Sequence, residues 1–184
     1  MVSLTVEQAE QAARQAIQAQ DFPKAEELAR QLLAGGSGPL HVWSILALAV
    51  RGQGRIEETK QIQQMLVEAA PQEMGLRFDL AETLLLLGEF ERGWREYRFR
   101  YDLPHTTSLG RKVQRPRWEG QKISGKTLLI YDEQGFGDTF QFLRLVAAAR
   151  ERSGARIVLQ IVPQLVPFVQ RLDGIDDVVL RGNV

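Results

Sequence analysis

The strongest constraint in this sequence is an internal repeat, in which the pattern at positions 20–22 returns at 54–56 and again at 88–90. The triplets Gln20-Asp21-Phe22, Gly54-Arg55-Ile56 and Gly88-Glu89-Phe90 align at this constant spacing, and each separates two stretches with helical periodicity. Glycine at the first position of two triplets suits the left-handed backbone that ends many helices, and the apolar third residue is expected to tuck under the second helix. The period therefore predicts three consecutive helical hairpins in roughly the first 100 residues.

Small residues repeat with the same period, which lets paired helices approach closely. Ser37 and Pro71 mark the ends of the first two units, since proline stops a helix. The small positions are Ala13, Ala47 and Ala81 on the first helices, and Ala25, Thr59 and Gly93 on the second helices. The six expected helices span residues 5–19, 23–34, 39–52, 55–69, 73–87 and 90–102.

The last of these helices carries an aromatic stripe at helical spacing, formed by Phe90, Trp94, Tyr97 and Tyr101. Such a stripe is typical of a packed core rather than of a ligand site. A solenoid also needs its ends covered. We therefore expect this helix to pack against residues 105–125.

The composition is that of a globular protein: 184 residues, 44% of them hydrophobic and 25% charged. The absence of cysteine excludes disulfides and thiolate metal sites, and the two histidines lie far apart in sequence. There is neither a signal-peptide pattern at the start nor an apolar run long enough to cross a membrane. We expect a cytoplasmic protein that binds no metal, no cofactor and no membrane.

The net charge of zero hides an asymmetry between the two parts of the chain. Residues 1–104 have an excess of acidic side chains and residues 105–184 an equal excess of basic ones. The imbalance is too mild for a nucleic-acid-binding face. It indicates two units with different roles.

The repeat resembles the tetratricopeptide family, and Trp43, Leu46, Ala47, Gly54 and Pro71 make the best single match. The resemblance covers residues 5–102 and implies a superhelix whose first helices line a groove for a protein or peptide. The carboxylate clamp of chaperone-binding members is absent, and these positions are equally compatible with an ordinary solvated surface. The expected groove residues are Glu7, Glu10, Arg14, His41, Ser44, Leu48, Arg51, Phe78, Glu82 and Leu85.

Residues 105–125 form the expected linker between a repeat domain at 1–104 and a second domain at 126–184. Turn and linker signals are frequent in this stretch. Four basic residues beside Trp118 form either a phosphate or acidic-partner patch or a solvated connector. They are Arg111, Lys112, Arg115 and Arg117.

The second domain alternates short apolar strands with helices. The pattern predicts strands at 126–131, 156–161 and 177–180, one helix from the loop after 131 to about Arg152, and a short one at 163–172. Short, helix-connected strands favour a parallel sheet with helices on its faces. The fold class is therefore an all-α solenoid followed by a partial Rossmann-like βαβαβ unit.

The loop after the first strand is the place where such sheets bind ligands. Its Gly135-Phe136-Gly137 is not a dinucleotide fingerprint, because Phe140 stands where the third glycine belongs, and no Walker lysine follows. Glycines here could let backbone amides approach an anion. Asp138 is also placed to cap the helix, with Gln141 completing a capping box.

The segment from Lys126 through this loop to Arg144 is similar to bacterial tetratricopeptide proteins with a C-terminal glycosyltransferase-like domain. Its Gly137-Asp138 pair is similar to the first-loop Gly-Asp of heptosyltransferases. The resemblance makes Asp138 the candidate general base for an acceptor hydroxyl. It implies a ligand-binding loop of Glu133, Gln134, Gly135, Gly137 and Thr139.

Enzymes of that family bind the nucleotide-sugar mainly through a second Rossmann-like domain later in the chain, and this sequence ends at Val184. We therefore expect a fragment, with a sheet edge at 177–180 that favours pairing with a second copy. Three hypotheses follow. The chain is a non-catalytic interaction scaffold, a glycosyltransferase whose repeats recruit the acceptor, or a nucleotide-binding regulator.

Overall fold

The computed structural model describes residues 5–103, 115–133 and 135–181. Contacts divide the chain into two compact units, Met1–Arg111 and Lys112–Val184. The first unit contains the helices α1 Val6–Gln18, α2 Phe22–Leu32, α3 Leu40–Gly52, α4 Ile56–Ala69, α5 Met74–Leu86 and α6 Phe90–Tyr97, then the 3-10 helix η1 Arg98–Asp102. The second contains β1 Thr127–Tyr131, α7 Phe136–Leu143, α8 Val146–Ser153, β2 Arg156–Ile161, η3 Pro163–Leu165, α9 Val166–Val169 and β3 Asp177–Leu180.

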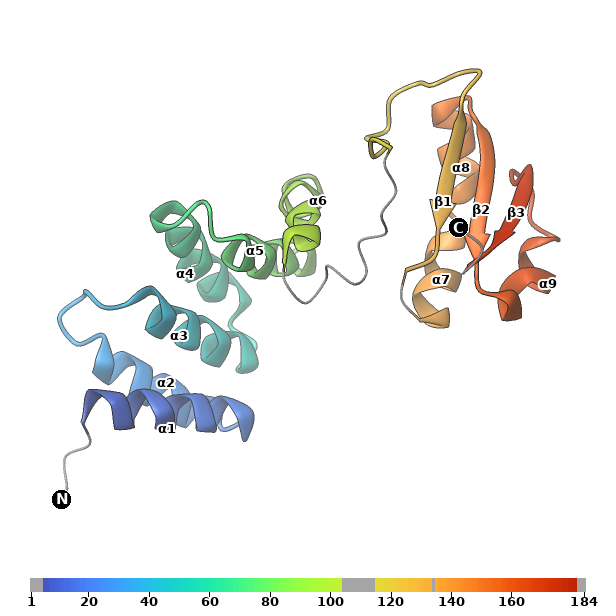
Figure 1. The fold of residues 1–184 in the computed structure, drawn as a ribbon. Helices are drawn as coiled ribbons and strands as arrows, with labels where there is room; N and C mark the ends of the chain where they lie inside the picture. The colour runs from blue at the N-terminus through green and yellow to red at the C-terminus, as the bar shows by residue number, and fades with distance from the viewer. Residues whose placement is uncertain (1–4, 104–114, 134, 182–184) are drawn as a thin grey trace. The chain divides into compact units, whose positions relative to one another are not determined.

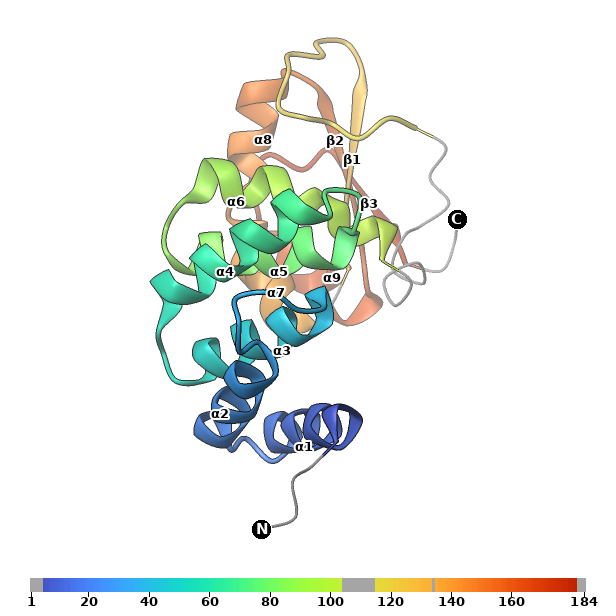
Figure 2. The ribbon, with the colours of Figure 1, turned by 90° about the vertical axis from the view of Figure 1, so that its left-hand side faces the viewer.

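The six expected helices of the solenoid are confirmed, and they follow one another as three hairpins (Figure 1, Figure 2). Each hairpin turns at the predicted triplet. Gln20, Gly54 and Gly88 have φ angles of 59°, 78° and 79°. The amide that follows each of them donates to the carbonyl five residues earlier, at Ala16, Val50 and Leu84 respectively. These bonds close the first helix of each hairpin in the same Schellman geometry, so one local motif sets all three turns.

The core of the solenoid lies between the hairpins. The small first-helix positions Ala13, Ala47 and Ala81 are buried, at 0%, 2% and 0% exposure. A main cluster joins the first two hairpins through apolar side chains of α1, α2, α3 and α4, among them Leu28 and Leu66. The recurring small residues therefore mark the close helix contacts that the period predicts.

The predicted burial of the aromatic stripe on α6 is wrong for its first half. Phe90 and Trp94 are 60% and 51% exposed, whereas Tyr97 packs on Phe78 with ring centroids 5.5 Å apart. The equivalent residue of the first hairpin, Phe22, lies against Gly52 of the second hairpin. Phe90 belongs to the last hairpin. Among the described residues no further hairpin follows it, so no helix of a next hairpin covers its ring.

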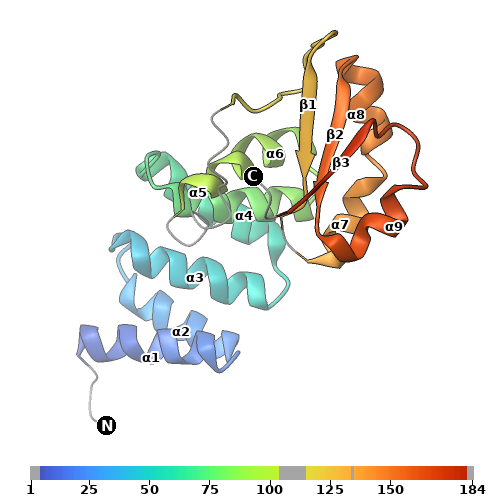
Figure 3. The same cartoon turned by 45° about the vertical axis from the view of Figure 1, so that its right-hand side comes forward.

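The second unit is a three-stranded parallel sheet, as the alternating pattern predicts, and its strand order is β1-β2-β3 (Figure 3). In the register, Ile130 lies opposite Leu159, and Leu159 opposite Val178. These residues share one cluster with Leu143 of α7 and Val169 of α9. Both helices therefore cover the same face, not opposite faces as expected, because right-handed crossovers between strands in sequential order all pass over one side.

The expected single helix from the first loop to about Arg152 is two helices. α7 ends at Leu143 and α8 begins at Val146. At the break, the Leu145 amide donates to the carbonyl of Phe142, three residues back, at 2.9 Å. This tighter turn interrupts the helical bonding. None of the described helices is both long and apolar enough to cross a membrane.

Candidate functional site

The first helices of the three hairpins share one surface of the solenoid, which we call the first-helix face. Two side-chain contacts, a hydrogen bond to a histidine ring and an ion pair, join neighbouring helices across it. His41 of α3 lies 3.0 Å from the Glu10 carboxylate of α1, and Arg51 of α3 lies 3.0 Å from Glu82 of α5. Both pairs hold groove residues of one hairpin to those of the next, so they fix the spacing of α1, α3 and α5.

The other predicted groove residues differ in their surroundings. Arg14 is exposed, and Leu48, at the equivalent position of the second hairpin, is 43% exposed. The Ser44 hydroxyl donates to the Leu40 carbonyl at 3.2 Å. Phe78 is half-buried and packs against Tyr97 with the two rings tilted by 39°. The middle of the first-helix face is therefore an exposed leucine between the His41–Glu10 hydrogen bond and the Arg51–Glu82 ion pair.

Asp79 is a residue of this region that the sequence analysis did not identify. In the repeat it occupies the position of Ile45, which is 4% exposed in the core of the second hairpin. Burial and the nearby Glu82 carboxylate raise the pKa of Asp79 to about 6, against a smaller opposing effect of Arg51. A carboxyl at a core position of the repeat was the signal that could have identified it.

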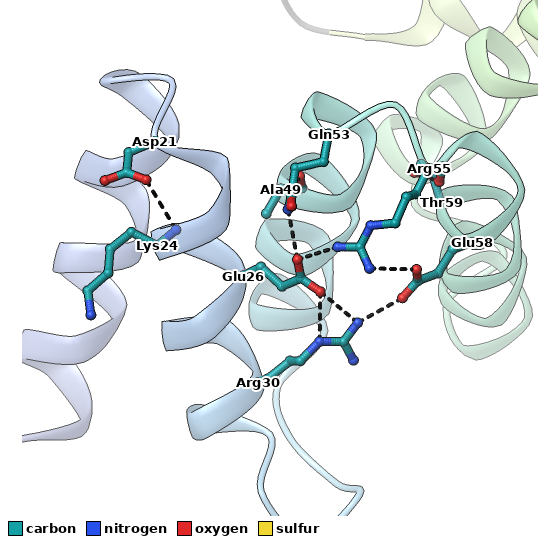
Figure 4. Close-up of polar contacts among 9 residues, drawn as sticks. All are labelled: Asp21, Lys24, Glu26, Arg30, Ala49, Gln53, Arg55, Glu58 and Thr59. Atoms are coloured by element: carbon teal, nitrogen blue, oxygen red, sulfur yellow. Dashed lines mark hydrogen bonds and ion pairs between the residues drawn. The ribbon is translucent and has the colours of Figure 1, made fainter.

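A polar network joins the first two hairpins on the side of the second helices (Figure 4). The Glu26 carboxylate of α2 accepts hydrogen bonds from Arg55, from Gln53 at 2.7 Å and from Arg30 at 2.9 Å. Arg30 also donates to Glu58 of α4 at 2.7 Å. The hydrogen bond from Arg55 is the main reason that the pKa of Glu26 falls to about 2, partly opposed by burial.

The loop at the carboxyl end of β1 differs from its expected geometry. α7 begins at Phe136 with Gly135 as its N-cap and no side-chain cap, so the prediction that Asp138 caps the helix is wrong. Asp138 instead lies exposed in the first turn, where the helix dipole favours a carboxylate. The Thr139 hydroxyl donates to the Gly135 carbonyl at 3.1 Å.

The two glycines of this loop have no special conformation. Gly135 has φ −79°, an angle open to any residue, and a Cβ on Gly137 would meet open space. Their positions therefore require no glycine on steric grounds. Gln134, which the resemblance places in the same loop, lies outside the described residues.

A buried carboxylate adjoins this loop and was missed from sequence. Asp132, directly after β1, accepts a hydrogen bond from the Val162 amide at 3.1 Å, and its side chain is only 2% exposed. Arg181, directly after β3, lies 3.6 Å from Asp132 and donates to the Glu133 carbonyl at 3.2 Å. Residues that directly follow parallel strands meet at one edge of the sheet. This rule could have identified Asp132 and Arg181 as neighbours from the sequence.

The rest of the second unit offers no better ligand site among the described residues. A shallow hollow near Arg150 lies at the opposite end of the sheet, and Arg150 is already paired there with Asp176. Within the described ranges there is no group of three metal-ligating side chains. Arg111 and Lys112 lie outside those ranges, while the Trp118 indole donates to the Gln121 carbonyl at 2.6 Å.

Comparison with known proteins gives the fold. No family model matches the chain. Protein FlbA of Caulobacter vibrioides is 30% identical over 105 residues, which cover 55% of this chain. That match spans 18% of FlbA, so this chain corresponds to less than a fifth of its length.

Among solved structures, the chain is similar to PcrH in its complex with the chaperone binding region of PopB. The match has a TM-score of 0.50 and 18% sequence identity, and it covers 59% of this chain and 93% of the PcrH chain. Together with the three hairpins, it shows that the N-terminal part of the chain is a tetratricopeptide-like solenoid. A small parallel sheet follows the solenoid.

Proposed function

We propose that the solenoid binds an extended segment of another protein on the first-helix face. The observation that carries this proposal is Leu48, which is 43% exposed in the middle of the face. The pairs His41–Glu10 and Arg51–Glu82 hold the three helices around it. Stacked hairpins of this kind present long binding surfaces, and the PcrH complex holds the chaperone binding region of PopB.

A matched pair of substitutions tests this function. Leu48→Glu places a charge in the middle of the first-helix face, whereas Met65→Glu changes a residue of α4 that is 38% exposed. On an array of extended peptides, the purified chain should lose binding with Leu48→Glu and keep it with Met65→Glu. Equal binding by the two variants would remove the first-helix face as the binding surface.

For the second unit, we propose that it is the first part of a glycosyltransferase-like domain, to which the solenoid delivers a protein or saccharide acceptor. The supporting observation is the parallel sheet, in which Asp138 lies in the first turn of α7, the helix that follows the carboxyl end of β1. On this proposal Asp138 is the general base toward the acceptor hydroxyl, and residues 133–139 contact the ligand. The functional division is a repeat domain at 1–104, a connector at 105–125 and the domain from 126 onward.

Residues 1–184 are proposed to act as a scaffold without turnover of their own. Sugar transfer and nucleotide-sugar hydrolysis should be absent with this chain and present with a longer protein that contains it. In that longer protein, Asp138→Asn should abolish transfer, while Asp173→Asn, a change at another exposed carboxylate, should not. Turnover by residues 1–184 that disappears in Asp138→Asn would refute the scaffold proposal.

Self-association is the last part of the proposed function. β3 lies at an edge of the sheet, and an edge strand offers unpaired backbone groups to another copy. Val179→Pro removes a backbone donor from this strand. It should reduce any concentration-dependent increase in mass measured by sedimentation.

A further inference from the structure

The junction between the first and second hairpins is apolar at its centre. Ala25 of α2 and Ala49 of α3 belong to one buried cluster, together with Ala16 of α1. Ala29, one turn further along α2, and Ile45 of α3 lie in the main core cluster. The first junction is therefore closed by alanine and isoleucine side chains.

The second junction, where α5 packs against α4 (Figure 2), has polar side chains at these same repeat positions. The equivalents of Ala25, Ala29, Ala49 and Ile45 are Thr59, Gln63, Thr83 and Asp79. Thr59, Gln63 and Thr83 are buried, and Gln63 lies one turn after Thr59 on the same side of α4. The second hairpin is thus joined to the third through a polar centre.

Two of these buried groups are unpaired within the described part of the chain. Neither Oε1 of Gln63 nor the hydroxyl of Thr83 has a hydrogen-bond partner there. Each gives up its bonds to water when the junction closes, which shifts the equilibrium toward the open junction by roughly tenfold. The half-buried Asp79, whose pKa burial raises to about 6, has the same effect once it is charged.

The larger apolar positions are the same at both junctions, so they do not offset this difference. Leu80 and Leu84 of α5 are as fully buried as Leu46 and Val50, their equivalents on α3. The polar positions are therefore what distinguishes the second junction from the first.

We propose that the third hairpin, α5 and α6, opens away from the second as one unit, and that this opening divides the first-helix face between α3 and α5. Within residues 5–103, each end hairpin stacks on one neighbouring hairpin. The stability of a repeat array depends on such interfaces. The first hairpin stacks through the apolar junction and the third through the polar one, so the third opens first.

The role of this opening rests on the proposed function. A segment bound across α3 and α5 joins the two sides of the junction and holds it closed, so the third hairpin acts as a clamp. The Arg51–Glu82 ion pair, at 3.0 Å, crosses the same line on the first-helix face. Both of its side chains are partly exposed, and such a pair contributes too little by itself to keep the junction closed.

Native-state hydrogen exchange of the whole chain, read helix by helix by NMR, tests the opening. The amides of α5 and α6 should share one opening equilibrium constant, at least about tenfold larger than that of α1 and α2. Equal constants for the two end hairpins would overturn the proposal, because the polar junction would then have no effect on opening.

A variant with an apolar second junction tests the cause. Gln63→Met with Thr83→Val nearly keeps both side-chain sizes and removes the unpaired groups. It should slow the exchange of α5 and α6 by at least about tenfold and leave α1 and α2 unchanged. Thr59→Val is the matched control and should not slow exchange, because the Thr59 hydroxyl already donates to the Arg55 carbonyl at 2.9 Å.

Thr83→Val alone repeats the test if the double variant does not fold. Equal slowing in all six helices would overturn the proposal, because it would show that the solenoid opens only as a whole.

A peptide from the array whose binding is lost in Leu48→Glu tests the closing step. At about ten times its Kd, this peptide should slow the exchange of α5 and α6 by about tenfold. A bound peptide that leaves their exchange unchanged would overturn the clamp. If no peptide binds, the proposed function and the closing step fail together, while the exchange of the free chain still decides whether the third hairpin opens.

Discussion

Replacing Asp79 by asparagine should stabilise the solenoid at neutral pH. Asp79 is half-buried on α5, at the position that Ile45 occupies in the second hairpin. Its pKa rises from 3.8 to about 6, chiefly because burial disfavours the charged form. A folded-state pKa above the unfolded one means that the folded protein binds more protons between these two values. Stability is therefore lost as the pH rises from about 4 to about 6.

The magnitude follows from the shift. A difference of about two pKa units corresponds to about 3 kcal/mol, and the part of the carboxyl that remains in solvent reduces this to about 1–2 kcal/mol. Asparagine has a similar shape and no charge, so Asp79→Asn should raise the free energy of unfolding by about 1–2 kcal/mol near pH 7 and by almost nothing near pH 4.

Urea unfolding followed by circular dichroism between about pH 4 and pH 8 measures this difference. Glu68→Gln, which neutralises an exposed carboxylate on α4, is the control and should change stability by less than about 0.5 kcal/mol at every pH. The reasoning fails if Asp79→Asn destabilises the chain at neutral pH, or if its gain is the same at both ends of the range.

Four further substitutions are predicted to change stability in the same unfolding assay. Gln20→Gly should stabilise the solenoid by about 1 kcal/mol. Gln20 has a φ angle of 59°, a left-handed conformation that costs a residue with a side chain, and the equivalent position of the next hairpin is Gly54. A loss of stability in this variant would contradict the shared turn geometry. Thr83→Ala should stabilise by up to about 1 kcal/mol, because the buried Thr83 hydroxyl has no partner among the described residues. Thr59→Ala should instead destabilise by about 1 kcal/mol, because its hydroxyl donates to a carbonyl at 2.9 Å. Glu26→Gln should destabilise by about 1–2 kcal/mol near pH 7. That difference should fade as the pH falls from about 4.5 toward 2, since the folded-state pKa of Glu26 is lowered to about 2.

The sequence alone determined the class of fold and most of the secondary structure, because both depend largely on local patterns. The constant spacing of the repeat placed the turns at Gln20, Gly54 and Gly88. The left-handed backbone predicted for Gly54 and Gly88 is confirmed, and Gln20 adopts it too. The short apolar runs placed all three strands and indicated that they pair in parallel. These features follow from residues that lie close together in the chain, so a single sequence contains enough information.

Features that depend on contacts between distant parts of the chain were decided only by the tertiary structure. The aromatic stripe of α6 has the helical spacing of a core, yet Trp94 is exposed because no hairpin in the described chain follows it. The meeting of Asp132 with Arg181 likewise depends on packing between distant segments. Periodicity shows which residues share one face of a helix, but the neighbour that covers this face comes from elsewhere in the fold.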